Sequence, residues 1–436
     1  MNFKLTEIGE LPFEWEVDTM ENALSEIIDY RGKTPVKSET GIVTLSAKSV
    51  KDGYIDYSKA YFISESTYQK FMVRGFPRKG DILLTTEAPL GLVARLDREK
   101  VGIAQRLLTL RGKKEYLLND YLMYYLMSNE GKHQLTSRQS GTTVTGIKQK
   151  EFRKCLISIP PFEEQKAIAH ILSTLDDKIE VNNQINKTLE NMAQAIFKQW
   201  FVDFEFPNEE GEPYKSSGGE MFESELGMIP KGWEVKKSSD IANVNIGKTP
   251  PRKEKECFTL DPDDYKWISI KDLGNSGAYI FDSSEYLTKE SIEKYNVKVV
   301  PDNTVVLSFK LTIGRVSITC GQMTTNEAIA HFNLSNKSKI TTEYLYLYLK
   351  SFDYGKLGNT SSIANAVNSK IIKSMPIIVP DNKTIKTFSE VMESVFSKIK
   401  YTIKQSDKLI EIRDSLLPKL MSGEIRVPLD EEGIVS

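Results

Sequence analysis

The feature that most constrains this chain is that its sequence is written twice. Four segments recur in the same order, and the pairs are LPFEWEV and IPKGWEV (residues 11–17 and 229–235), GKTP (32–35 and 247–250), NDYLMYYLMS and TEYLYLYLKS (119–128 and 342–351), and LISIPP and PIIVPD (156–161 and 376–381). A spacing of about 220 residues is far longer than a solenoid repeat. It predicts two copies of one whole module, and therefore two related but different binding surfaces.

The first part of each copy has short, mixed secondary-structure signals. Residues 80–96 and 302–319 each contain two β-branched or apolar runs around a turn, which predicts a strand pair. Residues 119–128 begin with polar side chains and continue with helical apolar spacing, which predicts a short helix. Strands and helices mixed in this order predict a compact α/β (α+β) domain.

The second part of each copy is predicted to be one long helix. Residues 162–204 contain no Pro or Gly, and a helix of about 40 residues is roughly 60 Å long. Apolar residues recur at heptad spacing, which is typical of an antiparallel coiled-coil pair. The predicted seam consists of Ile168, Ile171, Leu175, Ile185, Leu189, Met192 and Ile196 in the first helix, and Phe388, Val391, Val395, Leu409, Ile412 and Leu416 in the second.

Polar residues interrupt both stripes at matching positions. Lys178 and Asn182 interrupt the first, and Lys398 and Thr402 interrupt the second. We expect these midpoints to meet and to fix the register, with the lysine stems along the seam and the lysine heads in water. The alternative is that each helix packs only on its own domain.

The charge is unevenly distributed. The net charge is −2, but residues 31–160 carry 23 Lys and Arg against 12 Asp and Glu, and residues 226–380 carry 20 against 16. Residues 205–225, in contrast, carry one Lys and seven acidic side chains. Two basic modules joined by an acidic linker fit polyanion binding, which depends on the local field. Solvated surfaces also vary in charge without any ligand.

Several catalytic motifs are missing. Each GKT lacks the upstream glycine of a phosphate-binding loop, since Ile27 and Ala242 stand there, and each is followed by proline. The DPDDY segment at residues 261–265 is interpreted as an acidic turn, and Asp302 with Lys310 as a chance pairing. Cys155, Cys257 and Cys320 have no paired spacing and no neighbouring His, which argues against a zinc site or disulfide framework and favours the reducing cytoplasm. The sequence contains no run of 18 apolar residues, so it predicts no membrane span.

Together the repeated segments resemble a known family. Each of the two blocks opens with (I/L)PxxWE and closes before a long helix. These blocks resemble the DNA-specificity subunit of type I restriction-modification enzymes, and so do the segments GTTVTGIKQKEFRKCLISIPPFEEQKAIAHIL and RDSLLPKLMSGEI. The second helix departs from that pattern at its start, where DNKTIKTF replaces PPFEEQKAI.

The resemblance implies a division of the chain. It predicts a target-recognition domain at 1–160, a spacer helix at 161–204, an acidic linker at 205–225, a second target-recognition domain at 226–380, a second spacer helix at 381–425 and a tail at 426–436. Each domain is expected to read one half of a split double-stranded DNA site, and the antiparallel helices are expected to set the gap.

The resemblance also implies partners and cofactors. Two modification subunits would carry methyl transfer with S-adenosylmethionine, and two restriction subunits would add ATP- and Mg-dependent translocation and cleavage. This chain is expected to be non-catalytic, to bind no cofactor or metal itself, and to be cytoplasmic.

The candidate DNA-binding residues are polar side chains in turns and after strands. Backbone N–H and hydroxyl groups suit phosphates, while Gln105 and Arg106 suit base edges. The candidates are Lys33, Thr34, Lys48, Gln105, Arg106, Ser140, Thr142, Thr143 and Lys148 in the first copy, and Lys248, Thr249, Lys271, Lys310, Arg315, Asn326, Glu327, Ser361, Ser362, Asn365 and Lys370 in the second. Each of them is also explained by a solvated surface position. Trp15 and Trp233 are predicted to be core residues.

Two other functions stay open from the residues alone. The chain can be a two-module protein scaffold that binds DNA only incidentally, or a self-contained methyltransferase or nuclease. The missing motifs argue against the last.

Overall fold

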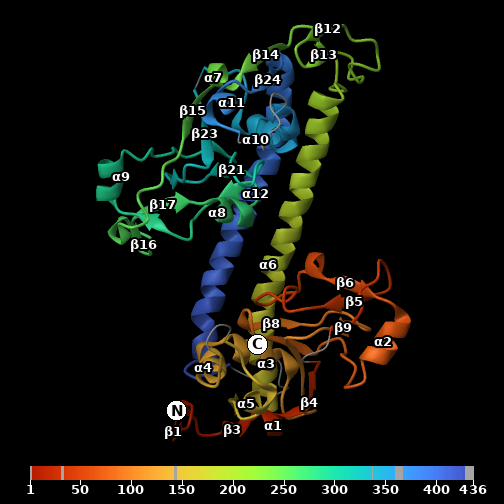
Figure 1. Cartoon of the computed structure of the whole chain (residues 1–436), viewed down its shortest axis with the longest axis vertical. Helices are drawn as coiled ribbons and strands as arrows, with labels where there is room; N and C mark the ends of the chain where they lie inside the picture. The colour runs from red at the N-terminus through yellow and green to blue at the C-terminus, as the bar shows by residue number, and fades with distance from the viewer. Residues whose placement is uncertain (1, 31–33, 142–144, 336, 359–366, 428–436) are drawn as a thin grey trace. The chain divides into compact units, whose positions relative to one another are not determined.

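The computed structural model describes residues 2–30, 34–141, 145–335, 337–358 and 367–427 (Figure 1). The chain forms two compact units, Met1–Val181 with Gln405–Ser436, and Asn182–Lys404. Each unit therefore contains one recognition module and half of each long helix.

The first module combines a hairpin, a pair of strands distant in sequence, two larger sheets and short helices. Trp15, which follows the hairpin, is fully buried. The strands are β1 (Phe3–Thr6) with β2 (Gly9–Pro12); β3 (Glu16–Thr19) with β11 (Leu156–Ile159); the order β4 (Leu24–Asp29), β10 (Leu107–Gly112), β7 (Ile82–Thr86), β8 (Leu90–Arg95); and the order β6 (Tyr61–Ile63), β5 (Ile42–Leu45), β9 (Gly102–Ile103). The helices are α1 (Met20–Ala23), α2 (Glu65–Phe71), α3 (Asn119–Met127), α4 (Asn129–Ser137) and α5 (Gln149–Phe152), with a 3₁₀ turn at Tyr57–Lys59.

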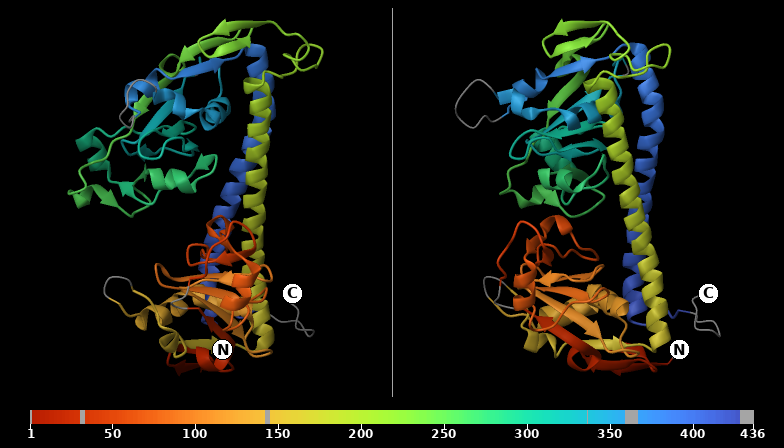
Figure 2. Two further views of the ribbon diagram at one scale, coloured as in Figure 1. Left: turned by 45° about the vertical axis from the view of Figure 1, so that its right-hand side comes forward. Right: turned by 90° about the vertical axis from the view of Figure 1, so that its right-hand side faces the viewer.

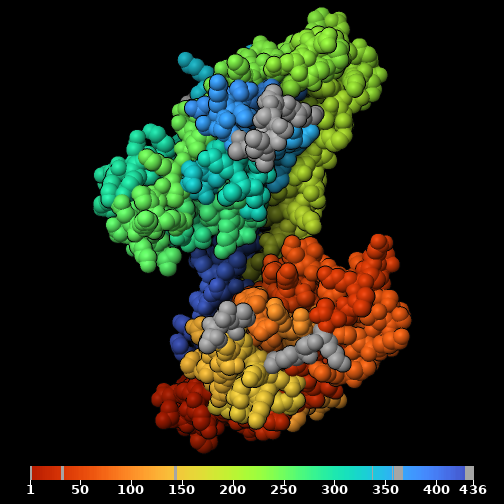
Figure 3. All heavy atoms as spheres, viewed as in Figure 1, coloured from red at the N-terminus to blue at the C-terminus, as the bar shows by residue number. Residues whose placement is uncertain are grey.

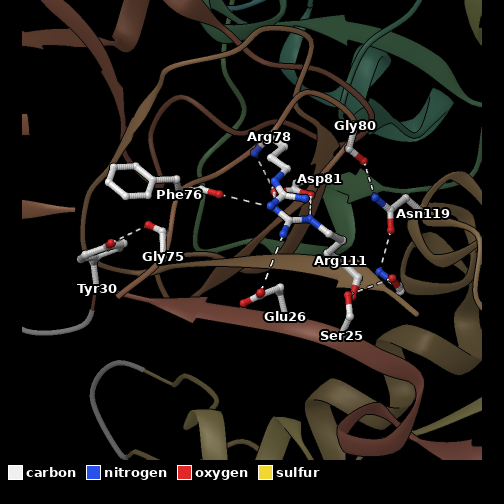
Figure 4. A network of polar contacts seen from close by, with 11 residues as sticks. Ser25, Glu26, Tyr30, Gly75, Phe76, Arg78, Gly80, Asp81, Arg111 and Asn119 are labelled. Carbon is white, nitrogen blue, oxygen red and sulfur yellow. Dashed lines mark hydrogen bonds and ion pairs between the residues drawn. The ribbon is translucent and has the colours of Figure 1, made fainter. Parts of the chain in front are cut away.

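An ion pair braces the first module's larger sheet (Figure 4). Arg111 on β10 donates from Nε and Nη2 to the two oxygens of Asp81, at 2.7 Å each, and Asp81 is almost fully buried. The hydrogen bonds that Arg111 donates to Asp81 raise the pKa of Arg111 above its usual value. Asn119 accepts from the Gly112 amide and donates to the Gly80 carbonyl, both at 2.7 Å, and so fixes the start of α3. These contacts connect β10, the turn before β7 and the start of α3.

The second module repeats this order. Trp233, the counterpart of Trp15, is also buried, so both tryptophans are core residues as predicted. The strands are β12 (Met221–Ser224) with β13 (Gly227–Pro230); β14 (Glu234–Lys237) with β24 (Pro376–Val379); the order β15 (Ala242–Ile246), β23 (Ile329–Leu334), β20 (Val305–Ser308), β21 (Val316–Thr319), β18 (Tyr279–Ile280); and the order β16 (Phe258–Thr259), β19 (Tyr286–Leu287), β17 (Tyr265–Ile268), β22 (Thr324–Thr325). The helices are α7 (Ser238–Ile241), α8 (Ile270–Asn275), α9 (Lys289–Tyr295), α10 (Thr342–Ser351) and α11 (Ser369–Lys373), with 3₁₀ turns at Lys255–Cys257 and Tyr354–Gly358.

These elements confirm the predicted α/β (α+β) class and the internal repeat. The strand pairs expected in residues 80–96 and 302–319 are β7–β8 and β20–β21. The short helix expected at 119–128 is α3, and the repeated segment at 342–351 forms the equivalent helix α10. Within these segments the local periodicity of apolar residues was sufficient to predict whether a strand or a helix forms.

The two long helices are α6 (Phe162–Phe197), which continues as a π-helical turn (Lys198–Val202), and α12 (Asn382–Met421). Within each unit they lie side by side (Figure 2). In the first unit Asp176 accepts from Arg413 at 2.8 Å, and Glu164 accepts from Arg426 just beyond α12. In the second unit the Asn186 side chain contacts Thr402. Residue numbers rise on one helix as they fall on the other within each unit, so the pair is antiparallel as predicted.

The predicted seam is partly wrong. Met192, Val391 and Ile412 are 50%, 40% and 37% exposed, and Lys178 and Lys398 lie on exposed faces, although we expected their stems in the seam. Leu172, Ala193, Met392 and Ile399 are buried instead. Asn182, Asn186, Thr402 and Ser406 are polar residues buried near the middles of the two helices, and Thr402 contacts Asn186. The lysine heads are exposed as expected, because their side chains lie on the outer helix surface.

Candidate nucleic-acid interface

Each module contains a matching pair of short parallel strands whose carboxyl ends meet at one edge, β5 with β9 in the first and β17 with β22 in the second. In the first module Thr44 of β5 is opposite Gly102 of β9, and the Ala104 amide then donates to the Leu45 carbonyl at 2.9 Å. In the second, Trp267 of β17 is opposite Thr324 of β22, and the Asn326 amide donates to the Ile268 carbonyl at 3.0 Å. The residues that follow these strands are therefore neighbours, although about 60 positions separate them in the sequence.

At the edge in the first module, Lys48 follows β5, and Gln105 and Arg106 follow β9. Lys48 and Arg106 are exposed and Gln105 is half-buried. Arg106 has φ +71°, and its Nε lies 2.6 Å from Glu87 Oε1 on the turn between β7 and β8. The structure thus brings these three candidate residues to one edge of the first module, the module coloured red to yellow in Figure 3.

The loop that follows α4 is anchored on the same turn. Ser140 and Gly146 exchange two backbone hydrogen bonds of 2.8 and 3.0 Å, and the Ile147 amide donates to the Thr86 carbonyl at 3.0 Å. A Cβ on Gly146 would lie 2.7 Å from the Thr86 carbonyl oxygen, so the approach requires glycine. Ser140 and Lys148 are exposed at the two ends of this loop. Thr142 and Thr143 lie outside the described residues.

In the second module the GKTP segment packs directly against the end of β22. The Lys248 amide donates to the Thr325 carbonyl at 2.9 Å, and the Thr249 hydroxyl donates to the Glu327 carboxylate. A Cβ on Gly247 would lie 2.1 Å from Thr325 Oγ1, so only glycine allows this contact. Lys248, Thr249, Asn326 and Glu327 form one cluster at the strand edge. In the first module Thr34 is exposed, and Lys33 lies outside the described residues.

Three further candidates surround this cluster. Lys271 is exposed on α8, directly after β17. Arg315 donates from Nη1 to the Ile270 carbonyl at 2.5 Å, which holds its guanidinium against α8. Lys310 is exposed on the turn between β20 and β21, with Nζ 5.4 Å from the Phe309 ring centre. Lys370 is exposed on α11, and Ser361, Ser362 and Asn365 lie outside the described residues.

Sequence reasoning missed two residues at this edge. Arg252 lies 4.2 Å from the Phe258 ring centre and 4.6 Å from that of Trp267, and it donates to both oxygens of Glu285 at 2.9 and 3.0 Å. Its position directly after GKTPP was the available signal. His331 on β23 is buried and lies 2.5 Å from Thr325 Oγ1; burial lowers the pKa of His331 to about 4. His331 is therefore neutral near pH 7, and its ring contacts the Thr325 side chain of β22.

This arrangement presents ammonium, guanidinium, amide and hydroxyl donors along one edge of each module, together with the carboxylates of Glu87, Glu285 and Glu327. Such donors suit phosphate oxygens and base edges. Within the described residues, His, Cys, Asp and Glu side chains form no group of three or more that could hold a metal ion. None of the described helices is long and apolar enough to cross a membrane.

Comparison with known proteins agrees with this geometry. The family model described as "Type I restriction modification DNA specificity domain" matches residues 14–191 and again 230–412, which are the two copies of the repeat. The MjaIX type I specificity subunit of Methanocaldococcus jannaschii is 30% identical, over 98% of this chain and 96% of its own length. The HindI specificity subunit of Haemophilus influenzae is 27% identical, over 80% and 87%.

A solved structure supports the fold. The crystal structure of the type I restriction-modification S subunit from M. genitalium has a TM-score of 0.54 and 16% sequence identity, and the alignment covers 96% of this chain and 97% of that one. The two matches of the family model together cover most of this chain, and the MjaIX subunit aligns with it nearly end to end. The chain therefore belongs to the DNA-specificity subunits of type I restriction-modification systems.

Proposed function

We propose that this chain reads a bipartite double-stranded DNA target, with one half-site read by each module. The observation that carries the proposal is the matched strand edge. Lys48 and Lys271 occupy equivalent positions, whereas Ala104, Gln105 and Arg106 correspond to Asn326, Glu327 and Ala328. A shared framework with different residues at the edge is what two unlike half-sites require.

The antiparallel helices serve as the spacer between the half-sites in this proposal. A helix pair with an apolar seam is stiff, whereas a flexible linker would allow many gaps. The buried Asn186–Thr402 contact favours one register.

The chain also acts as a non-catalytic frame for two modification subunits and two restriction subunits. Exposed apolar side chains recur on the two matched hairpins and support repeated protein contacts: Leu5 and Phe13 are 83% and 66% exposed at β1–β2, and Phe222 and Met228 are 39% and 53% exposed at β12–β13. S-adenosylmethionine would bind to the modification subunits, and ATP with Mg²⁺ to the restriction subunits, in a cytoplasmic complex.

The test is to assemble the chain with its modification subunit, methylate a random DNA library and locate methylated adenines by single-molecule sequencing. We expect one two-part motif with a fixed gap. The modification subunit alone is the control. Methylation without sequence preference, or at one continuous motif, would contradict the proposal, and the first outcome would favour a protein scaffold.

A further inference from the structure

The turns that join β7 to β8 and β20 to β21 are held by matching hydrogen bonds. In the first module the Thr86 amide donates to the Arg106 carbonyl at 3.0 Å; in the second the Phe309 amide donates to the Ala328 carbonyl at 2.9 Å. Thr85 Oγ1 accepts from the Leu92 amide, as Ser308 Oγ accepts from the Arg315 amide. Residues 85–92 therefore correspond one by one to residues 308–315.

The left-handed positions of the two turns also coincide. Gly91 and Gly314 have φ of +91° and +90°. Three residues earlier, Ala88 and Leu311 have φ of +53° and +62°. Each turn therefore has one non-glycine residue held in a conformation that side chains disfavour.

The two turns differ in the side chains that they present. Leu311 is 95% exposed, and the corresponding residue of the first module is alanine. Lys310 corresponds to Glu87, whose carboxylate is already occupied by Arg106. The second turn therefore offers a projecting apolar side chain beside a cation, and the first offers neither.

The second turn is braced. The Ser308 hydroxyl, fully buried, donates to the Thr312 carbonyl at 2.6 Å and accepts from the Arg315 amide at 3.1 Å. The Gly314 amide donates to the Ser308 carbonyl at 3.0 Å. A leucine in left-handed backbone, held almost entirely in water, contributes nothing to folding by burial. Its position is explained if it is preorganised for a ligand.

The charges around the turn identify the ligand as polyanionic. Lys310 precedes Leu311, and Arg315 at the other end of the turn is fixed against α8, next to Lys271. We propose that Leu311 makes an apolar contact with the C5-methyl group of a thymine in the half-site read by the second module, with Lys310 on a neighbouring phosphate. This inference rests on the proposed function. It makes Leu311 a specificity-determining residue that has no counterpart in the first module.

The experiment uses the complex of the chain with its modification subunit and a duplex that carries the mapped target. Each thymine of the second half-site is replaced in turn by uracil, which removes only the methyl group. We expect the wild-type complex to lose affinity about fourfold at one position, the factor that corresponds to one buried methyl group. The complex that carries Leu311→Ala should bind the thymine and uracil duplexes equally, with the affinity that the wild-type complex has for the uracil duplex.

Two further variants separate recognition from folding. Leu311→Gly removes the side chain but suits the left-handed backbone, so its thermal midpoint should equal or exceed that of the wild type while its methyl preference disappears. Leu260→Ala, which removes a leucine that is 79% exposed directly after β16, should keep the wild-type preference.

Two results would overturn the inference. One is a Leu311→Ala complex that keeps the full thymine-to-uracil ratio, and the other is a wild-type complex that is indifferent to uracil throughout the second half-site. In both cases, discrimination between the target and a scrambled duplex would leave the proposed function intact. Loss of that discrimination in the wild type would overturn both.

Discussion

The indole Nε1 of Trp15 donates a hydrogen bond of 3.0 Å to Glu164, and this contact connects the first copy of the repeated motif to the start of α6. The second module repeats the relationship, since Trp233 Nε1 donates to Asp381 at 3.0 Å, just before α12. Burial would raise the pKa of Asp381, but hydrogen bonds from Thr384 and Trp233 hold it below its usual value. The tryptophan of each module is thus fastened to an acidic residue at a long helix.

The first of these acids has a second partner, which leads to a stability prediction. Arg426 donates to Glu164 from Nε at 2.6 Å and from Nη2 at 3.0 Å, and Glu164 is 3% exposed. Arg426→Gln should destabilise the first unit by about 2 kcal/mol, because it leaves a buried carboxylate without its cation. Urea-dependent hydrogen exchange of residues 13–20 measures this.

The control for that variant is Lys419→Gln. Lys419 and Glu424 are half-exposed and 3.8 Å apart, so this change should cost less than about 0.5 kcal/mol. Adding Glu164→Gln to Arg426→Gln should restore part of the lost stability. Equal effects of the two single variants would show that the buried pair is no stronger than a surface pair.

Local patterns predicted the elements, but they did not predict which helix faces meet. The strand pairs β7–β8 and β20–β21 and helices α3 and α10 follow from periodicity within short windows. Met192 and Val391 were assigned to the seam, yet they are exposed, and Ala193 and Met392 are buried. The helices pack against their own modules as well as against each other, so the apolar stripe on each helix is broader than the seam. The sequence therefore does not define the centre of the seam to within one residue.

The site was harder to predict for a related reason. Lys271 and Asn326 become neighbours only because β17 and β22 pair in parallel, a contact between distant segments. The repeated GKTP indicated that Gly247 matters, but its reason, the close approach to Thr325, exists only in three dimensions. The exposed leucine at position 311 has no sequence signal at all, because apolar residues in turns are common.

Lysines at the matched strand edges should act through phosphates. Lys48→Ala and Lys271→Ala should each weaken binding to all duplexes and reduce the slope of log affinity against log salt by about one. Asn326→Ala, in contrast, should leave the salt slope unchanged and alter base preference in one half-site. Titration of the complex at several salt concentrations, with target and scrambled duplexes, distinguishes the two. A lysine variant that changed preference without changing the slope would contradict this assignment.

The modules should read their half-sites independently. Exchanging residues 20–155 for those of a relative should replace one half of the methylated motif and preserve the other half and the gap. The reason is that the exchanged segment lies within one compact unit and leaves Trp15 and both long helices in place. Single-molecule sequencing of DNA methylated by the hybrid complex measures the result. A change in both half-sites would disprove independent reading.

His331 should make the second unit sensitive to mild acid. Its pKa is lowered from 6.5 to about 4 by burial, so between these values the unfolded chain binds a proton that the folded chain does not. Stability should therefore fall as the pH decreases from 6.5 to 4, by at most roughly 3 kcal/mol. His331→Gln should have a flatter profile in this window, measured by urea unfolding at each pH. His133→Gln, on the exposed surface of α4, should follow the wild type.

The buried polar contact between the helices should lower the stability of the helix pair and fix its register. Asn186 and Thr402 are 9% and 1% exposed, in surroundings where apolar residues would pack without desolvation cost. Asn186→Leu with Thr402→Val should raise the thermal midpoint of the second unit, because an apolar pair replaces buried polar groups. The same change should loosen the register, since a polar seam residue favours the alignment in which it finds its partner. Methylation by the complex would then become less selective among targets that differ only in gap length.

Lys178→Ala with Lys398→Ala is the matched control, because both lysines lie on exposed faces, and it should alter neither property. A double seam variant that melts earlier and keeps its gap selectivity would show that the Asn186–Thr402 contact stabilises the helices without setting their register.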